Sequence, residues 1–484
     1  MIYLMVYQSK WGRRIFMIKK ALSIAMALTM AASLAGCGSS STTATDGAAS
    51  KSAESAGTAS STADGAKTKL TMTWRDEGNG EQNPLYQWFT QAYETYPDKD
   101  KIELDFQYIT ASEGDYFAKV ALALQSEDTA PDIVCEDTFY LPSDVAAGNL
   151  TNLDEYVNSW EDWTGGKFYE NVKSGVTADG SVYAVPYTAD SRGIWFNKEV
   201  FAKAGLPEDW APKTWQDILD ACKTIKEKCP DVIPFWCNAG TISGEATSMQ
   251  TYEELLYGTG EEVYEDGKWV TSSDNILKSL NFINDLFTND YATADLIYDA
   301  ESSDNVVNNY LPEGKVAMML NGYWITGNYK ETGSAPWADY AEKLGYAEMP
   351  TSEGQAPGNI TMSGGWTLAI PSLSDEKDAA WDFIKWCMNY DNYLNAVQLQ
   401  GVLSTRSDVA ADEVYSAQPF VQQATDFLEY AYYRPQNDQY TKVTTYIQTM
   451  VENVASGSLT PEDAMAQYKS DVENAVGAEN CVDK

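Results

Sequence analysis

The chain has 484 residues, with 33 lysines and arginines against 71 aspartates and glutamates, a net charge of −38, and no histidine. The absence of histidine excludes Ser-His-Asp and Cys-His nucleophilic sites, and it excludes zinc or iron sites ligated by histidine. A surface of this charge is repelled by nucleic acid and by anionic lipid headgroups, so we expect neither as a partner.

The first 36 residues have the pattern of a secretory signal. A basic stretch precedes an uncharged apolar run, Ala21–Leu34, which is too short for a stable membrane span. The next positions, Leu34–Cys37, resemble a bacterial lipobox, in which the cysteine is lipidated and becomes the new N-terminus. We therefore expect a lipoprotein that is anchored through Cys37 at the extracellular face of the bacterial cell membrane. The alternative is an ordinary signal cleaved near Ala35, with Cys37 incidental.

A low-complexity segment follows the expected anchor. Residues 37–68 are almost entirely Ser, Thr, Ala and Gly with a few charges, and they contain no large apolar residue. Such a segment cannot bury a core and is typical of a flexible linker. Its end-to-end distance is roughly 30 Å, enough to hold a folded part away from a membrane.

Strands and amphipathic helices alternate beyond the linker. Lys69 to Trp74 is a predicted strand, and Asn83-Pro84 begins a helix whose apolar residues share one face. Alternating apolar residues from Ile102 to Tyr108 predict a second strand, and Asp132 to Cys135 predicts a third. This order predicts an α/β unit with a largely parallel sheet, whose ligands bind at the carboxyl ends of the strands.

The remaining segments continue the same alternation. Thr214 and Asp217 form a predicted capping box that opens a helix. The pattern also predicts extended segments at 183–196, 232–236, 316–320 and 366–370, and helices at 115–125, 274–287, 377–389, 415–430, 440–455 and 462–476.

Four groups of segments then carry a resemblance to a known family. They are Gly180–Pro186 with Trp195–Leu206 and Lys213–Trp215; Pro312–Met318 with Asn321–Trp324; Gly364–Ile370 with Ala379–Ile384; and Gly457–Ala464. In this order they resemble the extracellular solute-binding proteins of sugar-type ABC importers, the group that contains maltose-binding protein. The similarity extends over about 69–476.

The resemblance implies a two-lobed α/β fold of the periplasmic-binding-protein type (type II), with a hinge and a cleft between the lobes. Lobe 1 would comprise 69–188 and 366–410, and lobe 2 would comprise 191–364 and 411–484. The implied function is capture of a mono- or oligosaccharide in the cleft and its delivery to ABC permease subunits. The resemblance implies a binding protein rather than an enzyme, and we expect it to act as a monomer.

Candidate ligand residues are aromatic and charged, since a sugar offers flat C–H faces and hydroxyls. Trp324, Trp236 and Trp366 follow or begin predicted strands, and the resemblance places a sugar-stacking aromatic at Trp324. The resemblance also aligns Asp190 with a carboxylate that lines the cleft. The remaining candidates lie at strand ends or in loops; they are Arg75, Glu77 and Asp137, with Arg406, Tyr433 and Arg434 as weaker candidates.

No cofactor or metal is expected. The chain has no Gly-rich phosphate loop ending in Lys-Ser or Lys-Thr, and Asp98–Asp100 lacks the glycine and closing glutamate of a calcium loop. The six cysteines beyond Cys37 contain no CxxC pair, so buried free thiols are favoured over a Cys229–Cys237 disulfide.

The same residue types are compatible with two other functions. A polyamine or other cationic solute would also use acidic and aromatic side chains. An extracellular glycoside hydrolase needs only two carboxylates, so the lack of histidine does not exclude it. An assay for released reducing ends separates a hydrolase from a binding protein.

Overall fold

The computed structural model describes residues 67–76 and 78–484. The segment Asp64–Lys484 forms one compact unit. The expected signal, lipidation site and linker, together with Glu77, lie outside the described residues.

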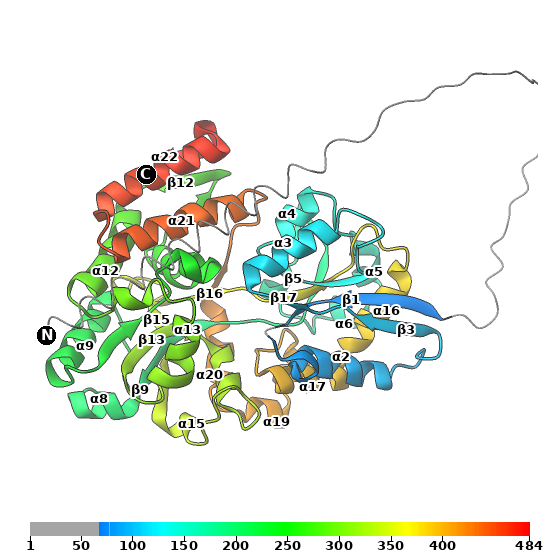
Figure 1. Ribbon diagram of the computed structural model, residues 1–484, viewed down its shortest axis with the longest axis horizontal. Coiled ribbons are helices and arrows are strands. Elements are labelled where there is room, and N and C mark those ends of the chain that lie inside the picture. Colours follow the sequence, from blue (N-terminus) through cyan, green and yellow to red (C-terminus); the bar gives the residue numbers. More distant parts are fainter. Residues whose placement is uncertain (1–66, 77) are drawn as a thin grey trace, which may run out of the picture. The chain divides into compact units, whose positions relative to one another are not determined.

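The first sheet has five strands in the order β3-β1-β5-β17-β8 (Figure 1). Their bounds are β1 Thr68–Thr73, β3 Ile102–Phe106, β5 Ile133–Asp137, β8 Ala184–Pro186 and β17 Trp366–Ala369. Strand β1 is parallel to both β3 and β5, whereas β17 runs antiparallel to β5 and β8. The sheet is therefore largely parallel, with one strand returning from much later in the chain.

The second sheet has four strands in the order β10-β13-β9-β14. Their bounds are β9 Arg192–Asn197, β10 Ile233–Trp236, β13 Val316–Gly322 and β14 Leu344–Ala347. Strand β10 is parallel to β13, and β9 is antiparallel to β13 and β14. Smaller sheets are formed by β15 Met349–Pro350, β16 Asn359–Ser363 and β18 Ala431–Tyr433, and by β11 Tyr264–Glu265, β12 Lys268–Ser272 and β19 Cys481–Asp483.

Helices cover the first sheet on two sides. In Figure 1, α3 and α4 lie on one side of the sheet, and α2 and α17 lie on the other. The helices of this part are α2 Pro84–Glu94, α3 Glu113–Ala123, α4 Leu141–Ala146, α5 Asp154–Asn158, α6 Glu161–Thr164, α7 Glu170–Ser174, α16 Lys377–Cys387 and α17 Tyr390–Gln400. Asn83 caps α2 by accepting from the Leu85 amide, and Pro84 is its first residue, as the sequence predicts.

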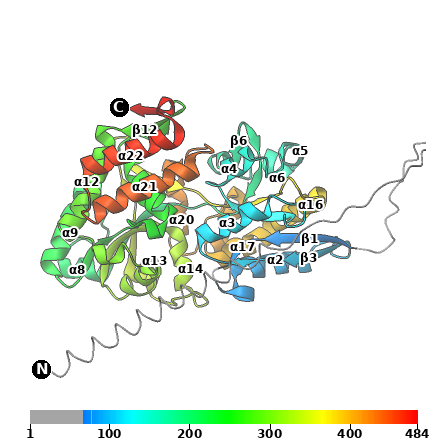
Figure 2. The same cartoon turned by 45° about the horizontal axis from the view of Figure 1, so that its top comes forward.

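The second sheet is accompanied by longer helices, of which α12, α21 and α22 lie side by side in Figures 1 and 2. The helices of this part are α8 Lys198–Ala204, α9 Trp215–Lys228, α10 Glu245–Thr247, α11 Glu254–Gly258, α12 Asp274–Thr288, α13 Ser302–Asn305, α14 Thr326–Tyr329, α15 Tyr340–Lys343, α19 Glu413–Ser416, α20 Val421–Asp426, α21 Tyr440–Ala455 and α22 Pro461–Val476. The short helix α18 Ser407–Ala410 packs against α17 and belongs to the first part. The predicted capping box of Thr214 and Asp217 is present at the start of α9.

One predicted helix is wrong in detail. The segment 415–430 is divided into α19, α20 and a 3-10 turn, Phe427–Tyr430. Pro419 cannot continue a helix, and Phe420 adopts a left-handed φ of 63°. The predicted extended stretch 183–196 is likewise two strands, β8 and β9, because the intervening residues cross from one sheet to the other.

The cysteines of the described segments are all unpaired. Five of the six are buried and Cys229 is half-buried. Within residues 67–76 and 78–484, no three Cys, Asp or Glu side chains are grouped so that they could hold a metal ion. In the same part of the chain, no helix has the length and apolar character needed to cross a bilayer.

Candidate ligand-binding cavity

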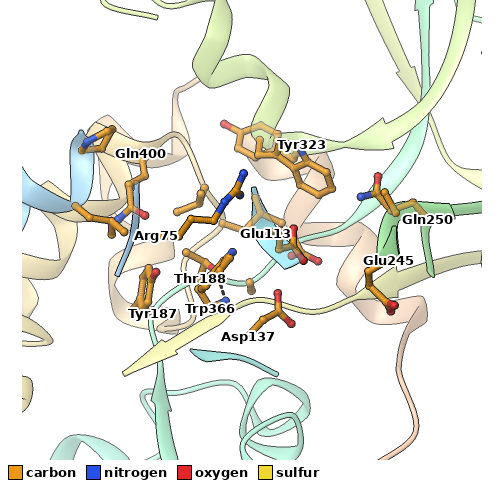
Figure 3. Close-up of a pocket in the computed structure, with 18 of the residues that line it drawn as sticks. Arg75, Glu113, Asp137, Tyr187, Thr188, Glu245, Gln250, Tyr323, Trp366 and Gln400 are labelled. Carbon is orange, nitrogen blue, oxygen red and sulfur yellow. Dashed lines mark hydrogen bonds between the residues drawn. The ribbon is translucent and has the colours of Figure 1, made fainter. Parts of the chain in front are cut away.

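A cavity of about 420 Å³ is lined by residues that follow or begin strands of both large sheets. Arg75 lies just beyond β1 and Asp137 ends β5, whereas Trp324 follows β13. Figure 3 shows the charged side chains of Arg75, Glu113, Asp137 and Glu245 around this space. The location matches the expectation that ligands bind near the carboxyl ends of parallel strands.

Trp324 forms one wall of the cavity together with Arg192 and Asp190. The strands β13 and β9 place Gly322 opposite Arg192, which brings the ring of Trp324 beside that arginine. The Arg192 guanidinium lies 4.9 Å from the centroid of the Trp324 ring, a cation–π contact. Arg192 also pairs with Asp190 and donates to the Met362 carbonyl at 2.9 Å. The ring of Trp324 is therefore half-buried and packs against an arginine that is itself held by an ion pair and a hydrogen bond.

Trp366 forms a second aromatic wall. It begins β17 directly opposite Asp137 of β5, and its ring is stacked on Phe117 with centroids 5.7 Å apart. Its backbone amide donates to the Thr188 hydroxyl at 2.7 Å, the dashed line in Figure 3. The preceding Gly365 has a φ of 143°, and a Cβ there would lie 2.0 Å from the Thr188 carbonyl oxygen. A side chain at Gly365 would therefore separate these two segments.

Arg434 joins segments that lie far apart in the sequence. Its Nη2 donates to Asp137 at 2.7 Å and to the Thr138 hydroxyl at 3.1 Å, and its Nη1 lies 3.6 Å from Glu245. The guanidinium also lies 4.6 Å from the centroid of the Phe139 ring. Only 6% of Arg434 is exposed, so these ion pairs are shielded from water. Arg434 therefore links the end of β5 to the start of α10.

The cavity contains carboxyl groups with altered acidity. Burial raises the pKa of Glu113 to about 7; the nearby charge of Asp137 adds to this rise, and Arg75 opposes it. Burial also raises the pKa values of Asp137 and Glu245, and in both cases the positive charge of Arg434 opposes the rise. Arg75 itself is held by a hydrogen bond from its Nε to the Ala111 carbonyl at 3.2 Å.

Most of the described candidates come together in this cavity. Arg75, Asp137, Asp190, Trp324 and Trp366 all line it. Arg434, a weaker candidate from the sequence, also lines it.

Three other candidates do not reach the cavity. Trp236 is buried in β10 with 4% of its surface exposed, and it is absent from the lining. Arg406 is fully buried and pairs with Asp162 and Asp408, and Tyr433 is not part of the lining either. Glu77 and Cys37 lie outside the described residues.

Several lining residues were missed by sequence reasoning. Arg192, Glu113, Glu245 and Gln250 all contribute to the cavity. Glu245 lies in the connection that follows β10, so the strand-end rule applied to this second sheet would have included it. Glu113 is in the first turn of α3, where no sequence signal separates a ligand contact from an ordinary first-turn acid.

Comparison with known proteins gives a family and several structural relatives. A family model described as bacterial extracellular solute-binding protein matches residues 78–393. The lactose-binding protein of Rhizobium radiobacter is 25% identical over 337 residues, 67% of this chain and 73% of that protein.

Two solved structures of solute-binding proteins are similar to this chain in fold. A solute-binding protein of Thermotoga lettingae bound with α-D-tagatose is 27% identical with a TM-score of 0.72, covering 85% of this chain and all of that chain. The maltose-bound MalE3 protein of T. maritima is 25% identical with a TM-score of 0.70, covering 84% and 99%. The two-lobed α/β fold expected from the sequence is thereby confirmed.

Proposed function

The chain belongs to the family of bacterial extracellular solute-binding proteins, and from this premise we propose that its solute is a carbohydrate held in the cavity between the two large sheets. The cavity of about 420 Å³ falls within the usual range for small-molecule sites, about 300–1000 Å³. The carbohydrates named for the three relatives support the same class.

The observation that carries this proposal is the combination of two tryptophans with opposed charges. Trp324 and Trp366 offer ring surfaces, while arginines and carboxylates of similar number line the remaining walls. The charged residues are Arg75, Arg192 and Arg434, and Glu113, Asp137, Asp190 and Glu245. Opposed charges of this kind bind the hydroxyls of a neutral polyol from both sides, as donors and as acceptors.

Charged solutes fit this cavity less well. A polyamine would have to displace or approach the three arginines, and like charges brought together in a partly buried site are unfavourable. An anionic solute would likewise be repelled by the four carboxylates. A neutral carbohydrate leaves the Arg434–Asp137 and Arg192–Asp190 pairs intact.

The proposed role is capture and delivery rather than catalysis. The carbohydrate is handed to the permease subunits of an ABC importer at the outer side of the cell membrane. The chain is anchored there as a monomeric lipoprotein through Cys37 after removal of residues 1–36, with 37–68 as the tether. The lipobox pattern and the polar low-complexity segment support the anchor.

Binding is proposed to close two lobes around the solute. Lobe 1 comprises 69–188 and 366–410, and lobe 2 comprises 191–364 and 411–484. The composition of the two large sheets supports this division. Apart from Thr68, the first residue of β1, all five strands of the first sheet lie within the residues of lobe 1, and all four strands of the second sheet, β9, β10, β13 and β14, lie within those of lobe 2. A solute that contacts both sheets binds the closed form better and shifts the population toward it.

A thermal-shift screen tests the proposal. The panel contains neutral mono- and disaccharides, including D-tagatose, maltose and lactose, with spermidine and glucose 6-phosphate as charged comparisons. A rise in Tm with a neutral sugar, and a smaller radius of gyration by small-angle scattering in its presence, are expected. A Tm rise with spermidine alone, or release of reducing ends from oligosaccharides, contradicts it.

A further inference from the structure

One tyrosine hydroxyl lies between two carboxyl groups behind the wall of the cavity. The Tyr440 oxygen is 2.6 Å from Glu245 Oε1 and 2.7 Å from Glu253 Oε1. Tyr440 and Glu253 are fully buried, whereas Glu245 lines the cavity. A phenol carries a single proton and can donate only one hydrogen bond.

The two short contacts therefore require a second proton. If both carboxyls were ionised, one of them would face the lone pairs of Tyr440 with no hydrogen between the two oxygens. An unsatisfied buried contact of this kind is costly, and more so for a charged group. With a proton on one carboxyl, that group donates to Tyr440, and Tyr440 donates to the other.

The surroundings assign the second proton to Glu253. Glu245 has Arg434 Nη1 at 3.6 Å, and its Oε2 accepts from the Thr444 hydroxyl at 2.6 Å, so its negative charge is stabilised. Glu253 forms no ion pair within the described part of the chain, and its Oε2 is buried without a hydrogen-bond partner. Burial and the charge of Glu245 raise the pKa of Glu253 to about 8, which agrees with this assignment.

Further titratable and charged groups surround this cluster. They are Glu113, Asp137, Arg434, Tyr140, Tyr252, Tyr257 and Tyr468. The four tyrosines are phenols whose pKa values are raised by burial, so they stay neutral. Arg434 is the one cation in this set, and it lies on the Glu245 side.

We propose that Glu253 holds a proton and donates it in a hydrogen bond to Tyr440, which directs the Tyr440 proton to Glu245 and keeps Glu245 an ionised acceptor in the cavity wall. No proton is transferred in this arrangement; each stays on its own oxygen. Glu253 and Tyr440 are positioning residues that act on the ligand through Glu245. The acceptor role rests on the proposed carbohydrate function, whereas the proton on Glu253 does not.

The first test uses the ligand-free protein, so its failure is distinct from a failure to bind sugars. Between about pH 5 and about pH 8 a protonated Glu253 is neutral in the folded state and ionised in the unfolded state, so it lowers stability as pH rises. Glu253→Gln removes this contribution and keeps a donor toward Tyr440. The Tm of Glu253→Gln should therefore fall less with pH than that of wild type. Glu227→Gln, an exposed acid on α9, is the matched control.

If the Tm of Glu253→Gln changes with pH in parallel with the Tm of wild type, Glu253 is not protonated in the folded protein and the proposal is wrong. Failure of Glu253→Gln to fold at neutral pH also overturns it, because glutamine reproduces the hydrogen-bonding pattern of the protonated acid. Infrared difference spectra give a second readout: the carbonyl band of a protonated carboxyl should be lost in Glu253→Gln.

A second variant tests the connection to Glu245. Tyr440→Phe removes the hydroxyl that stabilises the ionised form of Glu245, so the titration midpoint of Glu245 should move to higher pH. Carboxyl carbon-13 NMR measures this midpoint, with Glu245→Gln used to assign the signal. An unchanged midpoint in Tyr440→Phe contradicts the arrangement, since a merely structural tyrosine would leave it in place.

Discussion

Arg192 lies over the ring of Trp324, 4.9 Å from its centroid, while the same guanidinium pairs with Asp190. One residue therefore fixes the orientation of an aromatic ring and of a carboxylate in the same wall of the cavity. A ring held in this way loses little conformational entropy when a ligand stacks on it.

Gly322→Ala should weaken sugar binding without changing the backbone conformation. Gly322 has an ordinary φ of −84°, but a Cβ there would lie 1.7 Å from an atom of the Trp324 ring, so the ring must move. We expect affinity to fall by about 1–3 kcal/mol, as when an aromatic anchor is lost. Isothermal titration with the best sugar of the panel measures the change; unaltered affinity would show that the ring does not contact the ligand.

Arg434→Met should strongly destabilise the fold. The substitution leaves Asp137 largely buried without its cation, and breaking a buried ion pair on one side costs about 3–5 kcal/mol. The double variant Arg434→Met/Asp137→Asn should recover part of this loss, because the unpaired charge is removed as well. Urea denaturation measures both. Equal stabilities for wild type and Arg434→Met would contradict the proposed importance of this pair.

Glu136→Gln should stabilise the protein, and the gain should grow as pH rises. Glu136 is fully buried in β5, and neither of its carboxyl oxygens has a hydrogen-bond partner within the described residues. Burial, with the charges of Asp144 and Asp137, raises its pKa well above the usual range.

The sign follows from proton binding. Above the pKa of an unfolded glutamate, about 4.3, the folded state holds one proton more than the unfolded state, so wild type loses stability as pH rises. The Tm of Glu136→Gln minus that of wild type should therefore be larger at about pH 8 than at about pH 5. Glu155→Gln, at an exposed position on α5, serves as the control. The same difference at both pH values would refute a protonated Glu136.

Cys37→Ser should release the full-length chain from membranes. The prediction rests on the lipobox pattern at Leu34–Cys37, because a serine in that position cannot carry the thioether-linked lipid. Fractionation of expressing cells, followed by immunoblotting of membrane and soluble fractions, measures the distribution. Equal distributions for wild type and Cys37→Ser would contradict lipid anchoring through Cys37.

Local sequence signals predicted most elements of the fold. The caps at Asn83-Pro84 and Thr214 fix where α2 and α9 begin, and both caps form as expected. The strand pattern was sufficient to place Arg75 and Asp137 at strand ends that face the cavity. These features depend on residues close together in the chain, so the sequence alone carries the information.

The features of the cavity that the sequence did not predict depend on contacts between segments that are distant in the chain. Arg434 meets Asp137 only because β18 lies beside β16, and no local pattern encodes that pairing. Trp236 obeys the same strand-end pattern as Trp324, but it is still within β10 and its ring is buried, whereas Trp324 lies two residues past the end of β13. A difference of two residues in position relative to the end of the strand therefore decides whether a tryptophan packs in the core or lines the cavity.

The central claim is that a carbohydrate stacks on Trp324 in this cavity, and the most direct test measures affinity and stability together for Trp324→Ala and Trp236→Ala. With the best sugar of the panel, Trp324→Ala should lose about 1–3 kcal/mol of binding free energy and keep most of its stability. Trp236→Ala, the buried control, should lose about 3–5 kcal/mol of stability. A Trp324→Ala protein that binds the sugar as tightly as wild type would contradict the account.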